Sequence, residues 1–145
     1  MYLHEHDQHS HTYVARFAPG GDMQADFAAH FRELDKALAL ARTDGVVLAL
    51  LILFEAGHEV PDAHSRAMVA EYQSRDIFTA NLVIVSRNPL LRGVLTALEW
   101  IRGRKIKMQT ASSVDEATAM LERARGCPIP SLRLAAARVS QSNAA

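Results

Sequence analysis

The sequence predicts one α/β domain whose sheet, mainly parallel or mixed, is flanked by helices. Its 145 residues suit a single domain, and 49% of them are hydrophobic, as in ordinary globular proteins. Short apolar segments of strand length alternate with longer segments in which apolar residues recur every three or four positions. The resulting order, βαβαβαβα, is typical of a layered α/β fold. We assign residues 12–126 to this domain, 1–11 to a histidine-rich N-terminal arm and 127–145 to a C-terminal tail.

The first strand and the first helix are expected between residues 11 and 44. Residues 11–17 (HTYVARF) alternate in the period of a half-buried strand, and Pro19-Gly20-Gly21 ends it. Asp22 is a favourable N-cap for the helix that follows. Its apolar residues recur at spacings of three and four: Met23, Phe27, Phe31, Leu34, Leu38 and Ala41.

Residues 46–54 (VVLALLILF) predict a central strand that is covered on both faces. Periodicity alone would also allow a buried helix, but the segment starts directly after Gly45 and has no polar face. It is far shorter than the ~20 apolar residues of a membrane-spanning helix. A polar loop, EAGHEVPD (residues 55–62), follows at once and would lie at the edge of the sheet.

A second helix and a short strand are expected next. Asp62, after Pro61, opens the helix, which runs to about Arg75. Residues 82–85 (LVIV) then read as a short buried strand. The inward residues of this helix are Met68, Val69 and Tyr72.

The following helix and strand complete the sheet. Asn88 is an N-cap followed by proline, and the helix is expected over residues 89–102, up to Gly103. Residues 105–110 (KIKMQT) place two lysines on one face, which suits an edge strand because charge deters edge-to-edge pairing. The expected inward residues of the helix over residues 89–102 are Leu91, Val94, Leu95, Leu98 and Ile101.

A capping box starts the last clear helix. Ser113 and Glu116 have the spacing at which each side chain can bind the other residue's backbone N–H. Gly126 closes this helix, and the tail after it can hold a short alanine-rich helix. The expected inward residues are Val114, Ala117, Leu121 and Ala124.

Composition argues against several partners and compartments. Lys+Arg and Asp+Glu are both 16, so the net charge is zero and nucleic acid is not the expected partner. The N-terminus lacks the basic and apolar regions of a signal peptide, and no stretch suits insertion into a membrane. Cys127 is the only cysteine, which excludes an internal disulfide and fits a reducing compartment. We therefore expect a cytoplasmic protein without a membrane span.

No catalytic or cofactor motif stands out in the chain. Neither GxGxxG nor GxxxxGK[ST] can be written at Gly20-Gly21, and GxSxG is absent. Ser65 falls inside a predicted helix, and Cys127 reads as a packed small residue rather than a reactive thiolate. The sequence therefore predicts a protein that is not an enzyme and holds no cofactor.

The N-terminal arm carries the one dense group of potential metal ligands. These are His4, His6, His9 and His11, with Glu5 and Asp7. A flexible arm would lose entropy on closing such a site, so a solvated arm is the simpler interpretation. We expect no metal.

Two polar segments are the places to search for a binding site, because ligands in such folds bind beyond the carboxyl ends of the strands. The first surrounds the loop after the central strand, and its candidate partner-binding residues are Glu55, His58, Glu59, Asp62 and Arg66. The second is a helix N-terminus with candidate anion-binding residues Arg87, Asn88 and Arg92. The plainer interpretations are a polar loop and an N-cap with two solvated arginines.

One family resembles this order of elements. The stretch NLVIVSRNPLLRGVLTALEWIRGRKIKMQTASSVDEATAMLERA resembles bacterial STAS-like proteins of the anti-sigma-factor-antagonist type. GVVLALLILFEAGHEVPDAHSR is similar to the central strand, loop and helix of the same fold. The resemblance covers about residues 12–126.

The resemblance implies a regulatory module that binds an unidentified protein partner through Glu55–Asp62 and the helix after it. It is also compatible with a homo-oligomer. In that family the loop leads to a phosphorylatable serine in an Asp-Ser-Gly-like context, whereas here no Asp-Ser pair occurs and Ser65 is the nearest hydroxyl. The alternative is a carrier of small apolar ligands or lipids, as in related α/β folds that enclose a ligand between sheet and helix.

Overall fold

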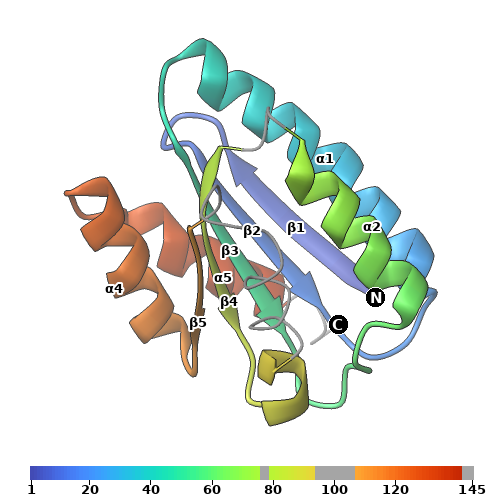
Figure 1. Ribbon diagram of the computed structural model, residues 1–145. Coiled ribbons are helices and arrows are strands. Elements are labelled where there is room, and N and C mark those ends of the chain that lie inside the picture. The colour runs from blue at the N-terminus through green and yellow to red at the C-terminus, as the bar shows by residue number, and fades with distance from the viewer. Residues whose placement is uncertain (76–78, 94–106, 142–145) are drawn as a thin grey trace.

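The chain folds around one five-stranded sheet with the strand order β1-β2-β3-β4-β5 (Figure 1). The structure, a computed structural model, describes residues 1–75, 79–93 and 107–141. The strands are β1 (Tyr2–Asp7), β2 (Thr12–Phe17), β3 (Leu48–Phe54), β4 (Ala80–Val85) and β5 (Lys107–Ala111). The helices are α1 (Met23–Thr43), α2 (Ala63–Ser74), α4 (Val114–Arg125) and α5 (Pro130–Gln141).

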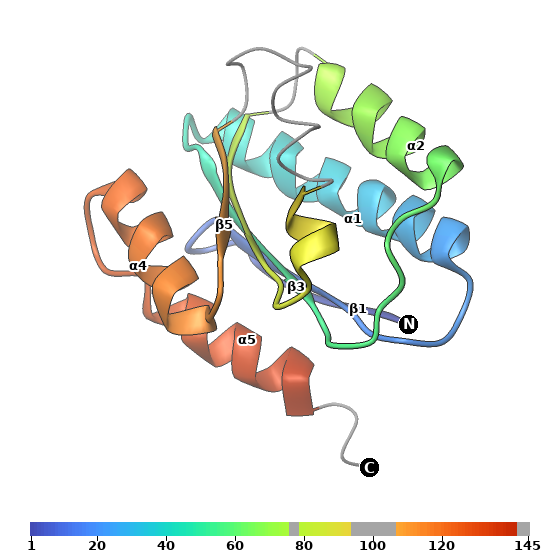
Figure 2. The same cartoon turned by 60° about the horizontal axis from the view of Figure 1, so that its bottom comes forward.

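The sheet is mixed, because β1 runs antiparallel to β2 while β2 to β5 run parallel to one another. Helices α1 and α2 lie on one side of the sheet, and α4 and α5 lie on the other (Figure 2). The predicted α/β class with a helix-flanked sheet is therefore confirmed. The predicted central strand is β3, which is third of five and buried along its whole length.

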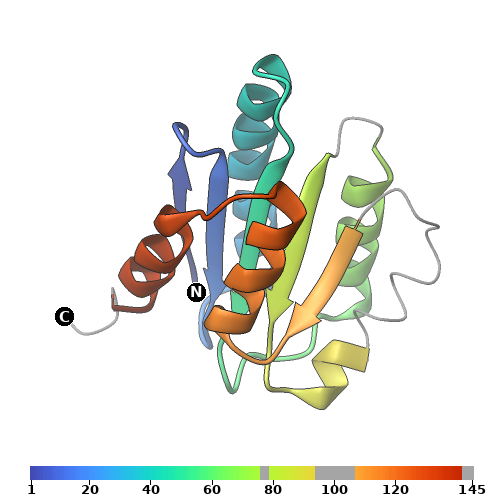
Figure 3. The same cartoon turned by 90° about the vertical axis from the view of Figure 1, so that its left-hand side faces the viewer.

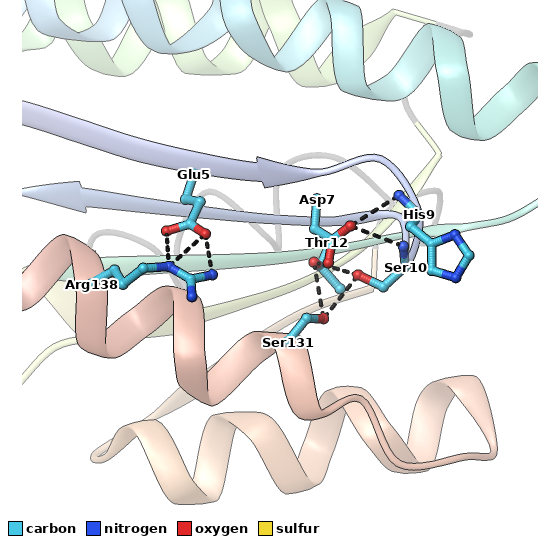
Figure 4. A network of polar contacts seen from close by, with 7 residues as sticks. All are labelled: Glu5, Asp7, His9, Ser10, Thr12, Ser131 and Arg138. Atoms are coloured by element: carbon cyan, nitrogen blue, oxygen red, sulfur yellow. Dashed lines mark hydrogen bonds and ion pairs between the residues drawn. The ribbon is translucent and has the colours of Figure 1, made fainter.

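The N-terminal residues are part of the sheet, so the expectation of a solvated arm is wrong. Residues 2–7 form β1, and a turn held by the Asp7 carboxylate, which accepts the His9 and Ser10 backbone N–H groups, leads into β2 (Figure 4). Helix α5 packs across β1 and β2, and Arg138 makes a two-pronged ion pair with Glu5 (Figure 4). Strand β1 and helix α5 thus belong to the same packed unit.

The structure confirms the predicted helix ends at Asp22, Asp62, Ser113 and Gly126. Asp22 and Asp62 accept backbone N–H groups at the starts of α1 and α2. Ser113 caps α4 by accepting the Glu116 N–H, but the Glu116 carboxylate binds Ser112 rather than Ser113, so the box is shifted by one residue. Gly126 ends α4 at φ +83°, the left-handed conformation that glycine adopts without strain.

Other sequence predictions are corrected by the structure or lie outside the described residues. Residues 89–93 are helical as predicted and Leu91 is buried, but the remainder of that helix, up to Arg102, lies outside the described residues. The edge strand begins at Lys107. In α4, Thr118 is buried and Ala124 is exposed, and Cys127 is also exposed, which corrects the expected packing of both.

Candidate protein-binding surface at the carboxyl edge of the sheet

Four connections meet at the carboxyl edge of the parallel strands, which is the lower end of the sheet in Figure 1. They are residues 18–22, 55–62, 86–88 and 112–113, each joining a strand to the helical segment that follows it. In parallel α/β sheets this edge is where ligands and partners bind. The two predicted segments therefore lie on adjacent connections, because β3 and β4 are hydrogen-bonded neighbours.

The loop of residues 55–62 is anchored at its first residue by a buried arginine. Arg16 of β2 is only 5% exposed, and its Nη2 donates to Glu55 Oε1 at 2.7 Å. Its Nη1 donates to the Val139 carbonyl of α5 at 3.1 Å. A buried guanidinium needs such a counter-charge, since an unpaired buried ion is strongly disfavoured. Glu55 therefore stabilises the fold.

His58 anchors the middle of the loop. The side chain is buried and its ring stands edge-on to Phe54 and Phe17, at centroid distances of 5.2 and 6.0 Å. Its Nδ1 lies 2.8 Å from the Glu59 carbonyl. Burial lowers the pKa of His58, because the charged imidazolium loses water there. The His58 ring thus packs against Phe54 and Phe17 and makes a polar contact with the Glu59 carbonyl.

Asp62 and Arg66 fix the end of the loop. The Asp62 side chain accepts the Ser65 backbone N–H at 2.7 Å, and this bond lowers the pKa of the carboxyl. Arg66 folds back and donates from Nη1 to the Pro61 carbonyl at 2.7 Å. Both side chains therefore secure the junction between loop and helix.

Glu59 is exposed, as Glu55 and Asp62 are, but unlike its four predicted companions its side chain makes no hydrogen bond or ion pair among the described residues. It borders a hollow of about 190 Å³ that separates its loop from residues 18–21. Asp26 and His58 also line this hollow, and the Asp26 carboxylate is paired with the N-terminal ammonium of Met1 at 2.9 Å. The arrangement is a fixed loop with a carboxylate presented to solvent.

In the predicted anion-binding segment, one of the backbone N–H groups at the start of the helix is already hydrogen-bonded. Asn88 Oδ1 accepts the Leu90 N–H at 3.0 Å, so the cap already uses one of the free donors. Arg87 is exposed and Arg92 half-buried. Leu90 is 73% exposed and was not singled out in the sequence, where it reads as one more apolar helix residue. This segment combines a cation with an apolar side chain at the same edge.

Ser65, the hydroxyl nearest to the loop, is completely buried. It lies in the first turn of α2, and its Oγ has no hydrogen-bond partner among the described residues. A kinase could reach this oxygen only if the first turn of α2 unfolded.

The histidines of the N-terminal region are spread over the structure. His4 stacks between the rings of Tyr2 and Tyr13, at centroid distances of 5.3 and 5.4 Å. His9 lies exposed in the turn, and His11 Nε2 contacts Asp44 Oδ2 at 2.8 Å. Within the described part of the chain, no three histidine, cysteine or acidic side chains come together as metal ligands.

Comparison with protein-family models, with curated proteins and with solved structures gives no match. None of the helices described is long and apolar enough to cross a membrane.

Proposed function

We propose that this chain is a non-catalytic regulatory module, resembling STAS domains, that binds a protein partner through residues 55–62 and α2. The observation that carries the proposal is the anchoring of the loop by Arg16, His58 and Asp62 while Glu59 stays in solvent. A loop that is already ordered loses little conformational entropy on binding. Its position at the carboxyl edge supports the same use.

The chemistry of the loop selects a basic partner. Glu59 brings exposed negative charge, and Glu55, which is partly exposed, is only partly offset by Arg16. Charge at the rim of an interface acts mainly on the association rate and on its salt dependence. A partner with lysine or arginine facing Glu59 would associate fastest at low salt.

Helix α2 also borders a hollow of about 310 Å³ against α1. Its lining combines Phe31, Met68 and Tyr72 with charged side chains, which are Arg32, Asp35, Glu71 and Arg75. The rings of Phe31 and Tyr72 stack at 4.3 Å, and the Tyr72 hydroxyl donates to Asp35 Oδ1 at 2.6 Å. The floor of the hollow is therefore rigid, and an apolar side chain of the partner can anchor there.

Regulation by phosphorylation of Ser65 does not fit this geometry, since the hydroxyl is buried. Partner choice then depends on surface complementarity alone. The module would act by being bound or released rather than by chemistry.

The test is affinity capture from the native extract with the protein as bait, using Glu59→Lys beside a matched control. Asp115→Lys makes the same charge change at the same edge, on a side chain that is 87% exposed but outside the proposed surface. The surface is supported if Glu59→Lys loses a captured protein that the parent and Asp115→Lys retain.

Equal capture by all three proteins would move the interface elsewhere, and Arg87→Glu then tests the neighbouring connection. Native mass spectrometry of the same material detects a bound apolar molecule. Such a molecule would favour the ligand-carrier alternative instead.

A further inference from the structure

Among the described residues, no further strand pairs with the outer edge of β1. Strand β1 is the outermost strand beside β2 (blue in Figure 3), and all six of its residues are in register with β2 without a bulge. Its sequence, YLHEHD, contains neither proline nor lysine, the residues that commonly protect an edge.

The hydrogen-bond pattern shows which groups of β1 point outward. Met1 and Ala18 exchange two backbone bonds, Met1 N to Ala18 O and Ala18 N to Met1 O, each of 2.8 Å. Hydrogen-bonded and non-bonded pairs alternate along an antiparallel ladder. Continuing that alternation, Leu3, Glu5 and Asp7 bond to β2. Tyr2, His4 and His6 then direct their N–H and C=O groups away from the sheet.

We propose that a second copy of this chain pairs with β1 in antiparallel fashion about a two-fold axis at His4. His4 then faces His4 of the other copy, and Tyr2 faces His6 in both directions. Every outward N–H and C=O group of the strand finds a partner in this register. The two sheets become one continuous sheet, a common form of isologous dimer contact.

Hydrogen bonding and charge select this register over its neighbours. With the two-fold axis perpendicular to the sheet, side chains on one face of the first copy lie on the same face in the second copy. Odd-numbered residues of β1 can therefore lie opposite only odd-numbered residues, and even-numbered residues opposite only even-numbered ones. The two neighbouring registers, shifted by two residues, are centred on Glu5 and on Leu3, and they leave the outward groups of Tyr2 and of His6 respectively without a partner in β1. The register centred on Glu5 also sets two glutamates opposite each other, which is destabilising. The register centred on His4 sets Leu3 opposite Glu5 instead.

The surroundings of the axis are also self-complementary. His4 Nε2 lies 3.9 Å from Glu33 on α1, and Glu33 pairs with Lys36 at 3.0 Å. Both lie near the axis, so the antiparallel helix of the second copy brings its own Lys36 toward Glu33. The carboxyl edge is not used, so the pairing stands apart from the proposed partner binding.

The first test compares His4→Pro with His4→Ala in the full chain, by sedimentation over a range of concentrations. Proline removes an N–H that faces solvent in the single chain, so the β1–β2 ladder remains. We expect the parent and His4→Ala to form dimers and His4→Pro to be monomeric, with a melting temperature similar to that of His4→Ala. A monomeric parent, or a dimeric His4→Pro, would overturn the proposal.

A second test fixes the register by oxidation in a Cys127→Ala background. At an axis through His4 the two Cα atoms are about 5.5 Å apart, the distance that a disulfide spans. His4→Cys should therefore cross-link to a dimer, whereas Glu5→Cys should not. Cross-linking of Glu5→Cys alone would show that the axis is at Glu5 and the proposed register is wrong.

Discussion

The two faces of the sheet are packed with different chemistry. The face under α1 and α2 is lined by rings, which include Tyr13, Phe17, Phe27 and His30, and the hydroxyls of Tyr2 and Tyr13 bond to each other. The face under α4 and α5 is aliphatic and built from small side chains: Val14, Ala49, Leu51, Ala117, Leu121, Leu132, Ala135, Ala136 and Val139. The same strands supply both faces, because neighbouring residues of a strand point in opposite directions.

Two layers that are buried to a similar extent can therefore differ in how their stability depends on pH. A buried imidazole ring packs among apolar side chains only in its neutral form, so the stability of the layer under α1 depends on pH. Aliphatic side chains have no ionisable group, so the packing under α4 and α5 depends on pH only through its ion pairs, such as that of Arg16 with Glu55. Four predictions test this comparison.

The largest effect is expected from a charge in either face. Leu50 and Leu51 are both fully buried on β3 and point to the ring face and the aliphatic face respectively. Leu50→Asp and Leu51→Asp should each lower the free energy of unfolding by several kcal/mol, because the new carboxylate is buried and Arg16, the guanidinium on the Leu51 face, is already paired with Glu55. Urea unfolding measures both, with Val47→Asp as an exposed control. If either variant unfolds at the parent's urea midpoint, β3 is not central.

Acid should weaken the ring face. Burial lowers the pKa of His30 from 6.5 to about 3 and also lowers those of His4 and His6. The unfolded chain takes up these protons near pH 6.5 and the folded chain does so only at lower pH. Stability is therefore complete above about pH 6.5 and is lost as the pH falls toward 3, by an amount on the order of 5 kcal/mol for His30.

His30→Phe should flatten this loss, because phenylalanine keeps the ring contacts and removes a buried Nδ1 that has no partner among the described residues. The free energy of unfolding is measured between pH 7 and 5, where carboxylates stay ionised. His9→Ala in the exposed turn is the control and should keep the parent's slope. An unchanged slope in His30→Phe would assign the acid sensitivity to other groups.

A smaller effect is expected at the start of α4, on the aliphatic side. Ser113→Ala removes the side-chain oxygen that accepts the Glu116 N–H at 3.1 Å. The expected cost is ~0.5–2 kcal/mol, with partner binding unchanged. Thermal unfolding and the capture assay measure the two effects separately. Loss of a partner at unchanged stability would assign Ser113 to the interface.

The smallest effect, and the only gain, is expected from Thr118→Val within the aliphatic face. Thr118 is fully buried, and its Oγ1 has no partner among the described residues. Valine has the same shape without the hydroxyl, so stability should rise by about 1 kcal/mol or less. Thr118→Ser keeps the hydroxyl, loses a methyl group and should be less stable than the parent. A destabilised Thr118→Val would show that this hydroxyl has a partner, such as an ordered water.

The sequence predicted the elements whose signals are local. Asp22, Ser113 and Gly126 act on backbone groups within a few residues of themselves, so their positions alone identify the helix ends. The apolar run before Glu55 likewise marked β3 and placed the polar loop at its end. The location of the candidate surface therefore followed from the chain order.

Tertiary structure alone decided which residues of that surface are free. Glu55 and Glu59 look equivalent in the sequence, but Arg16, which forms an ion pair with Glu55, lies on another strand. Strand β1 was missed because YLHEHD has few apolar residues, and its burial comes from α1 and α5. Arg125 likewise reads as a solvated helix end, yet it donates to the carbonyls of His11 and Val47. Such contacts join residues far apart in the chain, and their free energy exists only once the layers have packed.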